Sequence, residues 1–180
     1  MKHWIGLLFG LFAFILLSGC ASSRSINDPT NSLVFGYVDM TGAPTNILHC
    51  KIPEVSPSSE GSWGCGVSNG LFYNPFLPPG SYQVAEISGE GFLGGGKTRY
   101  SLPRQGNPTS VRISKPGIYF LGAYKYKNTK TGLFEQGKFS FEKISKPTQE
   151  ELLKRLLETD DIKSSPWANQ IRARLAELKP

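Results

Sequence analysis

A glycine-rich segment contains the most specific chemical pattern in the sequence. Residues 91–98 read Gly-Phe-Leu-Gly-Gly-Gly-Lys-Thr and match the phosphate-binding pattern G-x-x-x-x-G-K-[ST], in which backbone amides and Lys97 would contact phosphate. That chemistry requires the loop to open a helix. Residues 99–103 instead read Arg-Tyr-Ser-Leu-Pro, a strand-like run that a proline stops. We therefore expect a hairpin loop that binds no nucleotide and exposes Phe92 and Leu93 to a partner or lipid.

The histidine and carboxylate side chains form no pattern typical of catalysis or metal binding. His49 is the only histidine after residue 3, so a Ser-His-Asp arrangement or a histidine metal site would depend on it alone. Asp39, Glu86 and Glu90 lie near the ends of expected strands, but the sequence does not fix the distances that a glycosidase pair requires. We expect no catalytic residue, no metal and no cofactor.

The first twenty residues have the pattern of a secretion signal. Lys2 precedes an apolar run from Trp4 to Leu17, which gives way to small residues. This run is shorter than the roughly 20 residues that a membrane-spanning helix needs, so a retained transmembrane anchor is the weaker interpretation. Removal of residues 1–19 takes away Lys2 alone among the charged side chains and leaves 19 basic and 14 acidic residues.

The end of this signal resembles a known cleavage motif. Leu17-Ser18-Gly19-Cys20 is similar at all four positions to the lipobox of bacterial lipoproteins. The resemblance implies cleavage between Gly19 and Cys20, a diacylglyceryl group on the Cys20 thiol and an acyl chain on the new amino group. Several acyl chains on one residue attach a protein to a bilayer almost permanently, because each buried methylene contributes about 0.8 kcal/mol. The alternative is a free cysteine at the end of a signal peptide.

The residue after Cys20 implies a location. Lipoproteins that stay in the inner membrane commonly carry Asp at this position, whereas this chain has Ala21. The resemblance therefore implies the outer membrane, if the source is Gram-negative. Residues 21–32 are small and polar without apolar periodicity, and with the lipidated Cys20 they are expected to form a flexible tether.

The other two cysteines form an even pair in a chain that is expected to be exported. Oxidising compartments favour disulfides, and Cys50 and Cys65 each share a strand face with apolar neighbours. We expect a disulfide, which would stabilise the fold by ~3 kcal/mol on the chain-entropy model. Two separate buried thiols are the alternative.

Residues 33–145 are predicted to form a mainly β domain. Charged residues make up only 19% of the chain, and it contains 20 Gly and 13 Pro. Short apolar runs alternate with turn residues, which predicts nine strands. We place them at 33–40, 46–52, 63–67, 70–74, 81–88, 97–102, 110–114, 117–127 and 133–144. This number suits an antiparallel β-sandwich of about seven to nine strands.

A second resemblance supports the β-sandwich. Leu77-Pro78-Pro79-Gly80-Ser81-Tyr82-Gln83-Val84 resembles the Pro-Gly turn and strand of carboxypeptidase-regulatory-like, or prealbumin-like, domains. Lys115-Pro116-Gly117-Ile118-Tyr119 repeats the same Pro-Gly-x-Tyr pattern. The resemblance implies a binding or structural module that has no catalytic residues.

Residues 146–180 are predicted to form two amphipathic helices. Thr148 and Glu151 form a capping box, and Ser165-Pro166 announces a second helix. Leucines at helical spacing follow the first cap, and Trp167, Ile171 and Leu175 follow the second. We expect these apolar stripes to cover the strand at 117–127, whose first half is apolar on both faces. A helical arm that recruits another protein is the alternative.

Basic residues cluster on the last predicted hairpin and the last helix. The hairpin carries lysines with Tyr124 and Tyr126 interleaved, and the helix carries three more cations; the set is Lys125, Lys127, Lys130, Lys138, Lys143, Lys146, Arg172, Arg174 and Lys179. Such a surface would suit anionic cell-envelope polymers or lipid headgroups. Ordinary solvated lysines are the alternative, and the export signal argues against nucleic acid.

The sequence therefore predicts a lipid-anchored envelope lipoprotein that acts as a non-catalytic binding or structural module. An accessory subunit of an envelope secretion or transport complex is the first alternative, in which Leu156 or Trp167 would remain exposed for a partner. An envelope hydrolase, with a cleft around His49 or the carboxylates, is the second.

Overall fold

The computed structural model describes residues 25–43, 49–55, 62–90, 97–129 and 138–178. Within these ranges the chain is mainly β, as the sequence predicts. The strands are β1 (Ser32–Asp39), β2 (His49–Pro53), β3 (Ser62–Ser68), β4 (Leu71–Leu77), β5 (Gly80–Tyr82), β6 (Glu86–Glu90), β7 (Lys97–Ser101), β8 (Val111–Ile113), β9 (Ile118–Thr129) and β10 (Lys138–Ile144). The helices are α2 (Gln149–Leu156), α3 (Asp160–Lys163) and α4 (Trp167–Glu177).

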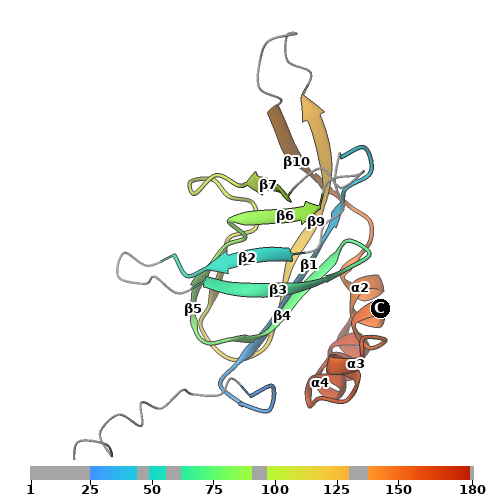
Figure 1. The fold of residues 1–180 in the computed structure, drawn as a ribbon. Helices are drawn as coiled ribbons and strands as arrows, with labels where there is room; N and C mark the ends of the chain where they lie inside the picture. The colour runs from blue at the N-terminus through green and yellow to red at the C-terminus, as the bar shows by residue number, and fades with distance from the viewer. Residues whose placement is uncertain (1–24, 44–48, 56–61, 91–96, 130–137, 179–180) are drawn as a thin grey trace, which may run out of the picture.

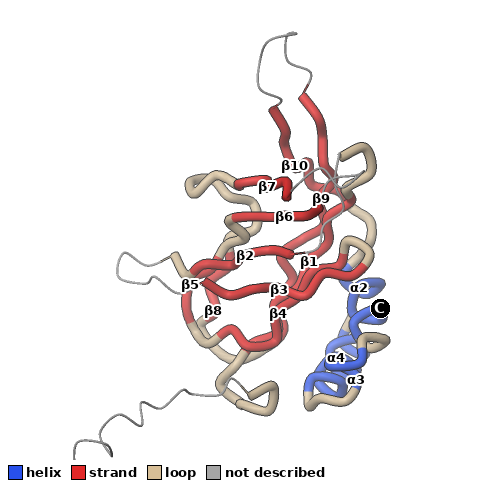
Figure 2. Tube along the Cα trace, in the orientation of Figure 1, coloured by secondary structure: helices blue, strands red, loops and turns tan. Residues whose placement is uncertain are grey.

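Eight of these strands form one strongly curled sheet, which resembles half of a barrel (Figure 1). The strand order is β10-β9-β1-β4-β3-β2-β6-β7, and β5 and β8 form a separate two-stranded sheet (Figure 2). β1 runs parallel to β9 and antiparallel to β4. The predicted antiparallel sandwich is therefore wrong in its finer detail, because the main sheet is mixed and folds over its own interior.

The position of β1 explains the mixed sheet. Leu33, Val34 and Phe35 are fully buried, so this strand is covered on both faces. Val34 and Val38 point into the interior of the curled sheet, whereas Leu33 and Phe35 point to its outer face. A strand that is apolar on both sides belongs in the centre of a sheet with both faces covered. β1 reaches that position by lying between β4 and β9.

The chain changes sheets at Val84, where a single strand was expected over 81–88. The Val84 N–H donates to the Thr109 hydroxyl at 2.9 Å, and the Asn107 side-chain amide donates to the Val84 carbonyl at 2.8 Å. Both backbone groups of Val84 are thus taken by side chains and are lost to strand pairing. The expected strand becomes β5 and β6, which lie in different sheets.

A bulge in β9 changes which of its side chains point inward. The register against β1 shifts between Phe35 and Tyr37, where Gly122 adopts a φ of +107°. An extra residue in a strand reverses the side-chain alternation beyond it. Tyr124 therefore lies in the inner core, although without the bulge it would share the outer face with Phe120.

The C-terminal helices are buried within the domain, as the sequence predicts, but they cover the outer face of the sheet around β1 and β4 and reach the predicted strand at 117–127 only at Ile118 and Phe120. Their buried side chains are Leu152, Leu153, Leu156, Ile162, Trp167 and Ile171. These side chains form a second core with Leu33, Phe35 and Leu71, and Phe120 packs against it. Figure 1 shows the helices beside β1 and β4. The predicted capping box of Thr148 and Glu151 is present.

Polar contacts at the rim also hold the helices to the sheet. Arg155 donates to the Asn69 carbonyl at 2.9 Å, and its guanidinium lies 5.5 Å from the centre of the Tyr37 ring. The Tyr73 hydroxyl donates to the Asp161 carboxylate at 2.9 Å. Burial, and then this hydrogen bond, raise the pKa of Tyr73 to about 12.

The described part of the predicted tether is folded against the domain. Asp28 accepts hydrogen bonds from the Thr30 N–H and hydroxyl, and Ile26 packs against the helix core. These bonds hold the pKa of the Asp28 carboxyl below its usual value. Both cores are built from residues between Ile26 and Leu178. None of the described helices is long and apolar enough to span a bilayer.

Candidate binding pocket

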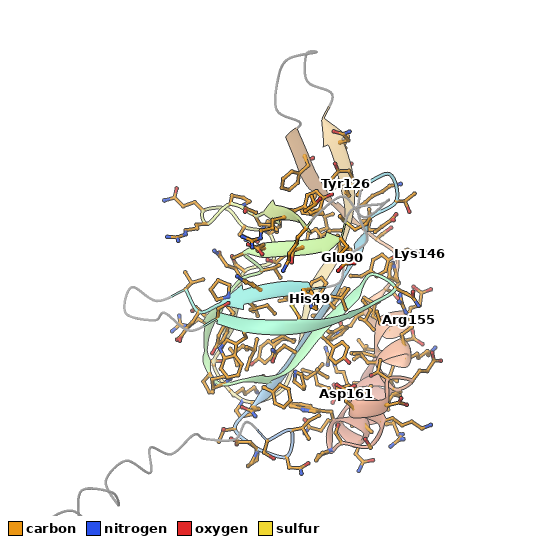
Figure 3. All side chains as sticks on the ribbon, viewed as in Figure 1. His49, Glu90, Tyr126, Lys146, Arg155 and Asp161 are labelled. Carbon is orange, nitrogen blue, oxygen red and sulfur yellow. A yellow bond between two sulfur atoms is a disulfide. The ribbon has the colours of Figure 1, made fainter. Side chains whose placement is uncertain are left out.

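The two edge strands of the curled sheet approach each other through aromatic side chains. Tyr100 of β7 lies 5.1 Å from Phe139 of β10 and 5.7 Å from Tyr126 of β9, measured between ring centres. Phe139 lies 5.7 Å from Phe141 in the same way. Figure 3 labels Tyr126 in this region, near the ends of β7 and β10. We call the junction of β7 and β10 the seam.

A pocket of about 470 Å³ lies in the seam. Its lining comes from the end of β7, the segment that follows it, and β10. Among the described residues the lining consists of Ser101, Leu102, Pro103, Pro108, Phe139, Ser140 and Phe141. The volume lies within the roughly 300–1,000 Å³ typical of small-molecule sites. No titratable side chain appears in this described lining.

A buried polar network fixes the wall that carries Pro108. The side-chain oxygen of Asn107 accepts from the Thr109 N–H at 3.0 Å and from the Thr109 hydroxyl at 2.6 Å. The Tyr124 hydroxyl donates to the Pro108 carbonyl at 2.8 Å, with the Leu121 carbonyl 2.7 Å away. Burial raises the pKa of Tyr124, so its phenol remains a donor. The pocket therefore has a rigid wall.

Beneath this wall lies a smaller cavity that reaches the inner core. Leu102, Pro108 and Phe141 line both spaces, and Val84 and Ile87 line the smaller one. The seam pocket is thus the outer end of the interior of the half-barrel. An apolar group is the chemistry that fits it best, because the two serines are the only polar side chains in the described lining.

Sequence reasoning missed this pocket because it depends on distant strands that meet when the sheet curls. One signal was available. Phe139 and Phe141 occupy one face of β10, and both remain partly exposed although they pack against the core. Two partly exposed aromatics on one face of an edge strand indicate a surface that is left for contact.

The predicted disulfide joins β2 to β3. Cys50 and Cys65 are direct register partners, with Cα atoms 5.2 Å apart, and the structure bonds them. Both side chains are buried in the inner core. The bond lies on strands away from the seam, so it supports the sheet and does not line the pocket.

No hydrogen bond or ion pair joins the candidate catalytic residues to one another in the described structure, although His49, Glu86 and Glu90 share one face of the neighbouring strands β2 and β6. His49 is exposed and opposite Ser88, with no hydrogen bond between the two side chains in the described structure. Glu86 lies opposite Lys51, and Glu90 opposite Lys97. Hydrogen bonds from the Thr41 side chain, and then from the Thr41 N–H at 2.9 Å, lower the pKa of the Asp39 carboxyl. Among the described residues no group of three His, Cys, Asp or Glu could hold a metal.

The glycine-rich pattern is followed by a strand. Residues 91–96, with Phe92 and Leu93, lie outside the described residues. Lys97 and Thr98 begin β7, which pairs antiparallel with β6. A phosphate-binding loop opens a helix, so the context that this chemistry requires is replaced by an edge strand.

The basic cluster is more dispersed than predicted. Lys125 lies 4.0 Å from Asp39, and Lys127 lies 3.4 Å from Glu142. Tyr124 and Tyr126 point into the core because of the bulge, so they do not alternate with these lysines on the surface. On α4, Arg172 donates to Asn169 and Arg174 pairs with Glu177. Lys130 and Lys179 lie outside the described residues.

The predicted processing site lies outside the described residues. Gly19, Cys20 and Ala21 fall within residues 1–24. Cleavage and lipidation therefore stay predictions from the sequence.

Comparisons with known proteins give a distant structural match. No family model matches the chain, and no curated protein does. A crystal structure of a DUF3823 family protein from Parabacteroides merdae matches at 16% identity with a TM-score of 0.30. The match covers 65% of this chain and 60% of that one, so the chain spans less than two thirds of that protein.

Proposed function

We propose that this chain is an envelope lipoprotein, anchored through Cys20, that acts as a non-catalytic binding module. The observation that carries the proposal is the seam pocket. It has the size of a small-molecule site, an apolar lining and a wall fixed by buried hydrogen bonds. The four-residue lipobox supports the anchor, and Ala21 supports the outer membrane.

The exposed surface favours this proposal over an accessory subunit that docks through its helices. Leu156 is fully buried and Trp167 is 3% exposed, so the helix stripes are used within the domain. Val55 is the one large apolar side chain that stands exposed in the described ranges. The apolar stripes of α2 and α4 are therefore not available for docking to another protein. A secretion or transport complex could still be joined through the seam.

The repeated Pro-Gly-x-Tyr pattern supports a proposed kinship with carboxypeptidase-regulatory-like domains, here within a curled mixed sheet in place of a sandwich. The Tyr82 hydroxyl donates to the Pro78 carbonyl at 3.0 Å, and the Tyr119 hydroxyl donates to the Lys115 carbonyl at 2.6 Å. In each copy the acceptor lies four residues earlier, directly before the Pro-Gly pair. Each copy thus fixes the turn at the start of one strand, β5 in the first copy and β9 in the second.

Binding of the uncharged dye Nile red tests the proposed pocket. The protein would be the chain that begins at Ala21, since it contains every residue of both cores. We expect saturable fluorescence enhancement that Ser101→Trp abolishes, because the indole fills the pocket from an exposed strand position. Ser114→Trp, at an exposed serine outside the lining, is the matched control. Equal enhancement in both variants would contradict the pocket as the binding site.

A further inference from the structure

The two segments that form the seam carry the excess positive charge of the chain. Residues 97–104 and 138–146 contain six basic residues and one acidic residue. Their net charge of +5 equals that of the whole chain without its signal peptide, which has 19 basic and 14 acidic residues. The remainder of the chain is therefore balanced in net charge, and the excess lies within the two segments that carry the pocket.

The carboxylates near the pocket are offset by other cations. Glu142, the acidic residue of the two segments, alternates with Phe141 along β10 and so lies on the opposite face, where it pairs with Lys127 at 3.4 Å. Glu86 is the register partner of Ser101, and Lys51 stands opposite Glu86 on its other side. Neither carboxylate leaves a net negative charge at the seam.

Cations at the pocket have no such partner in the described structure. Lys143 is exposed and follows Phe139 and Phe141 on the same face of β10. Arg104 is exposed and follows Pro103 of the pocket wall. Neither side chain forms an ion pair among the residues that the structure describes. An apolar pocket thus opens beside unpaired cations.

We propose that the seam pocket binds a single-chain anionic amphiphile, such as a fatty acid, with its chain in the pocket and its acidic group near Lys143 and Arg104. This inference rests on the proposed binding function and specifies its ligand class. Burial of the methylenes would stabilise the complex, and the headgroup would gain from the positive charges of Lys143 and Arg104. An apolar ligand would not use the neighbouring cations, and a purely ionic ligand would not use the apolar pocket.

The position of the pocket favours a ligand that arrives from solution. The chain enters the fold at Ser25–Asn31, at one end of the molecule, and β7 and β10 lie toward the other (Figure 1). Anchorage at Cys20 would place the bilayer on the side of Ser25–Asn31. A monomeric amphiphile reaches the pocket without the domain turning toward the membrane.

Fluorescence titration with dansylated undecanoic acid tests the inference. The protein is the chain from Ala21, and the competitors are laurate, dodecyl maltoside and dodecyl trimethylammonium below their micellar concentrations. We expect laurate to displace the probe about tenfold more effectively than the uncharged and cationic chains do. Arg104→Glu with Lys143→Glu should weaken probe binding by about tenfold and leave Nile red binding unchanged. Lys115→Glu, at an exposed lysine outside the seam, should change neither.

The possible outcomes separate the two proposals. Nile red binding with equal competition by all three dodecyl compounds would overturn the anionic class and leave the binding module intact. If neither Nile red nor the dansylated acid binds, both the binding module and the anionic ligand class are overturned. Displacement of the probe by a short polyglutamate peptide as effectively as by laurate would show a polyanion site and overturn the amphiphile. If the probe binds anionic vesicles and does not bind the protein, the affinity belongs to the membrane surface. That outcome would also overturn the amphiphile proposal.

Discussion

At the residue scale, one glycine decides which side chains of β9 reach the inner core. Gly122 has a φ of +107°, and a Cβ atom there would lie 2.9 Å from the Tyr124 hydroxyl. That hydroxyl holds Pro108 in the pocket wall. The identity of this residue therefore connects a backbone bulge to the shape of the pocket.

Gly122→Ala should lower the free energy of unfolding by about 1–3 kcal/mol, because a left-handed conformation and a displaced tyrosine both oppose the methyl group. Gly64→Ala is the matched control, since a Cβ atom at Gly64 has no neighbour within 4 Å and no positive φ is required. It should stay within about 0.5 kcal/mol of the wild type. Urea denaturation measures both, and an equal effect would contradict the bulge.

The two tyrosines of the Pro-Gly-x-Tyr repeat differ in burial, so their hydroxyls should contribute differently to the free energy of unfolding. Tyr82 is 1% exposed and Tyr119 is half-buried. Tyr82→Phe removes the donor to the Pro78 carbonyl at a part-buried hydrogen bond and should cost about 1–2 kcal/mol, whereas Tyr119→Phe, at an exposed hydrogen bond, should cost about 0.5 kcal/mol. Chemical denaturation of the two variants at neutral pH makes the comparison.

The raised pKa of Tyr82 predicts that the protein loses stability in alkali. Burial, and then the nearby Glu54, raise its pKa to about 12 in the folded protein, above the ordinary value of 10.0. The folded state therefore retains this proton longer than the unfolded state, and the contribution to stability is lost as the pH rises from about 10 to about 12. We therefore compare the free energy of unfolding at pH 9 and at pH 11, each about one unit from the ordinary tyrosine pKa. The fall between the two pH values should be smaller in Tyr82→Phe than in the wild type. Equal falls would contradict the assignment.

At the element scale, the local elements could be predicted and their pairing could not. The capping box of Thr148 and Glu151 and the turn before Tyr82 are defined by neighbouring residues, so the sequence states them directly. The parallel pairing of β1 with β9 joins segments about 85 residues apart, and no local pattern specifies it. The short helix α3 was missed because its four residues carry only one buried side chain, Ile162. An isolated glycine within a strand pattern does indicate a bulge, and Gly122 offered that signal.

The helices α2 to α4 are expected to stabilise the domain by covering the outer face of β1, β4 and β9. Leu156 is fully buried in that core, while Leu157 is partly exposed at its margin. Leu156→Ala should therefore cost about 2–5 kcal/mol, and Leu157→Ala clearly less. Thermal unfolding followed by circular dichroism measures the difference. If both variants unfold at the wild-type temperature, the helices are not part of the cooperative domain.

The disulfide should stabilise the pairing of β2 with β3. Cys50 and Cys65 are separated by 15 positions in the sequence, a loop length for which the chain-entropy model gives about 3 kcal/mol. The double variant Cys50→Ala with Cys65→Ala should lower the urea midpoint, and added dithiothreitol should lower that of the wild type alone. An alkylation mass of the unreduced, unfolded wild type that shows two free thiols would contradict the bond.

At the scale of the whole molecule, the curled sheet accounts for the candidate site. β7 and β10 are the last strands of the sheet on either side, and they meet because the sheet closes on Tyr100 and Phe139. The lining residues are thus brought together by curvature, which is a property of all eight strands. The basic residues of the same segments were visible in the sequence, but their position beside an apolar pocket was not. The sequence therefore predicted the charge and missed the cavity.

In the proposed function, attachment of the whole molecule to the envelope would depend on Cys20, and its sorting between membranes on Ala21. Cys20→Ala removes the thiol that the lipobox resemblance assigns to diacylglycerol, and because cleavage follows that modification the variant should remain as an unprocessed precursor without acyl label. Ala21→Asp should keep the label and move the protein to the inner membrane in a Gram-negative host, since the acyl chains still anchor it while the retention signal changes. Ala21→Ser, which keeps the residue small and uncharged, should remain in the outer membrane. Metabolic labelling with radioactive palmitate, followed by separation of the two membranes on a density gradient, measures all three. Equal label in the wild type and Cys20→Ala would contradict the anchor, and an unchanged distribution of labelled Ala21→Asp would contradict the sorting role of residue 21 alone.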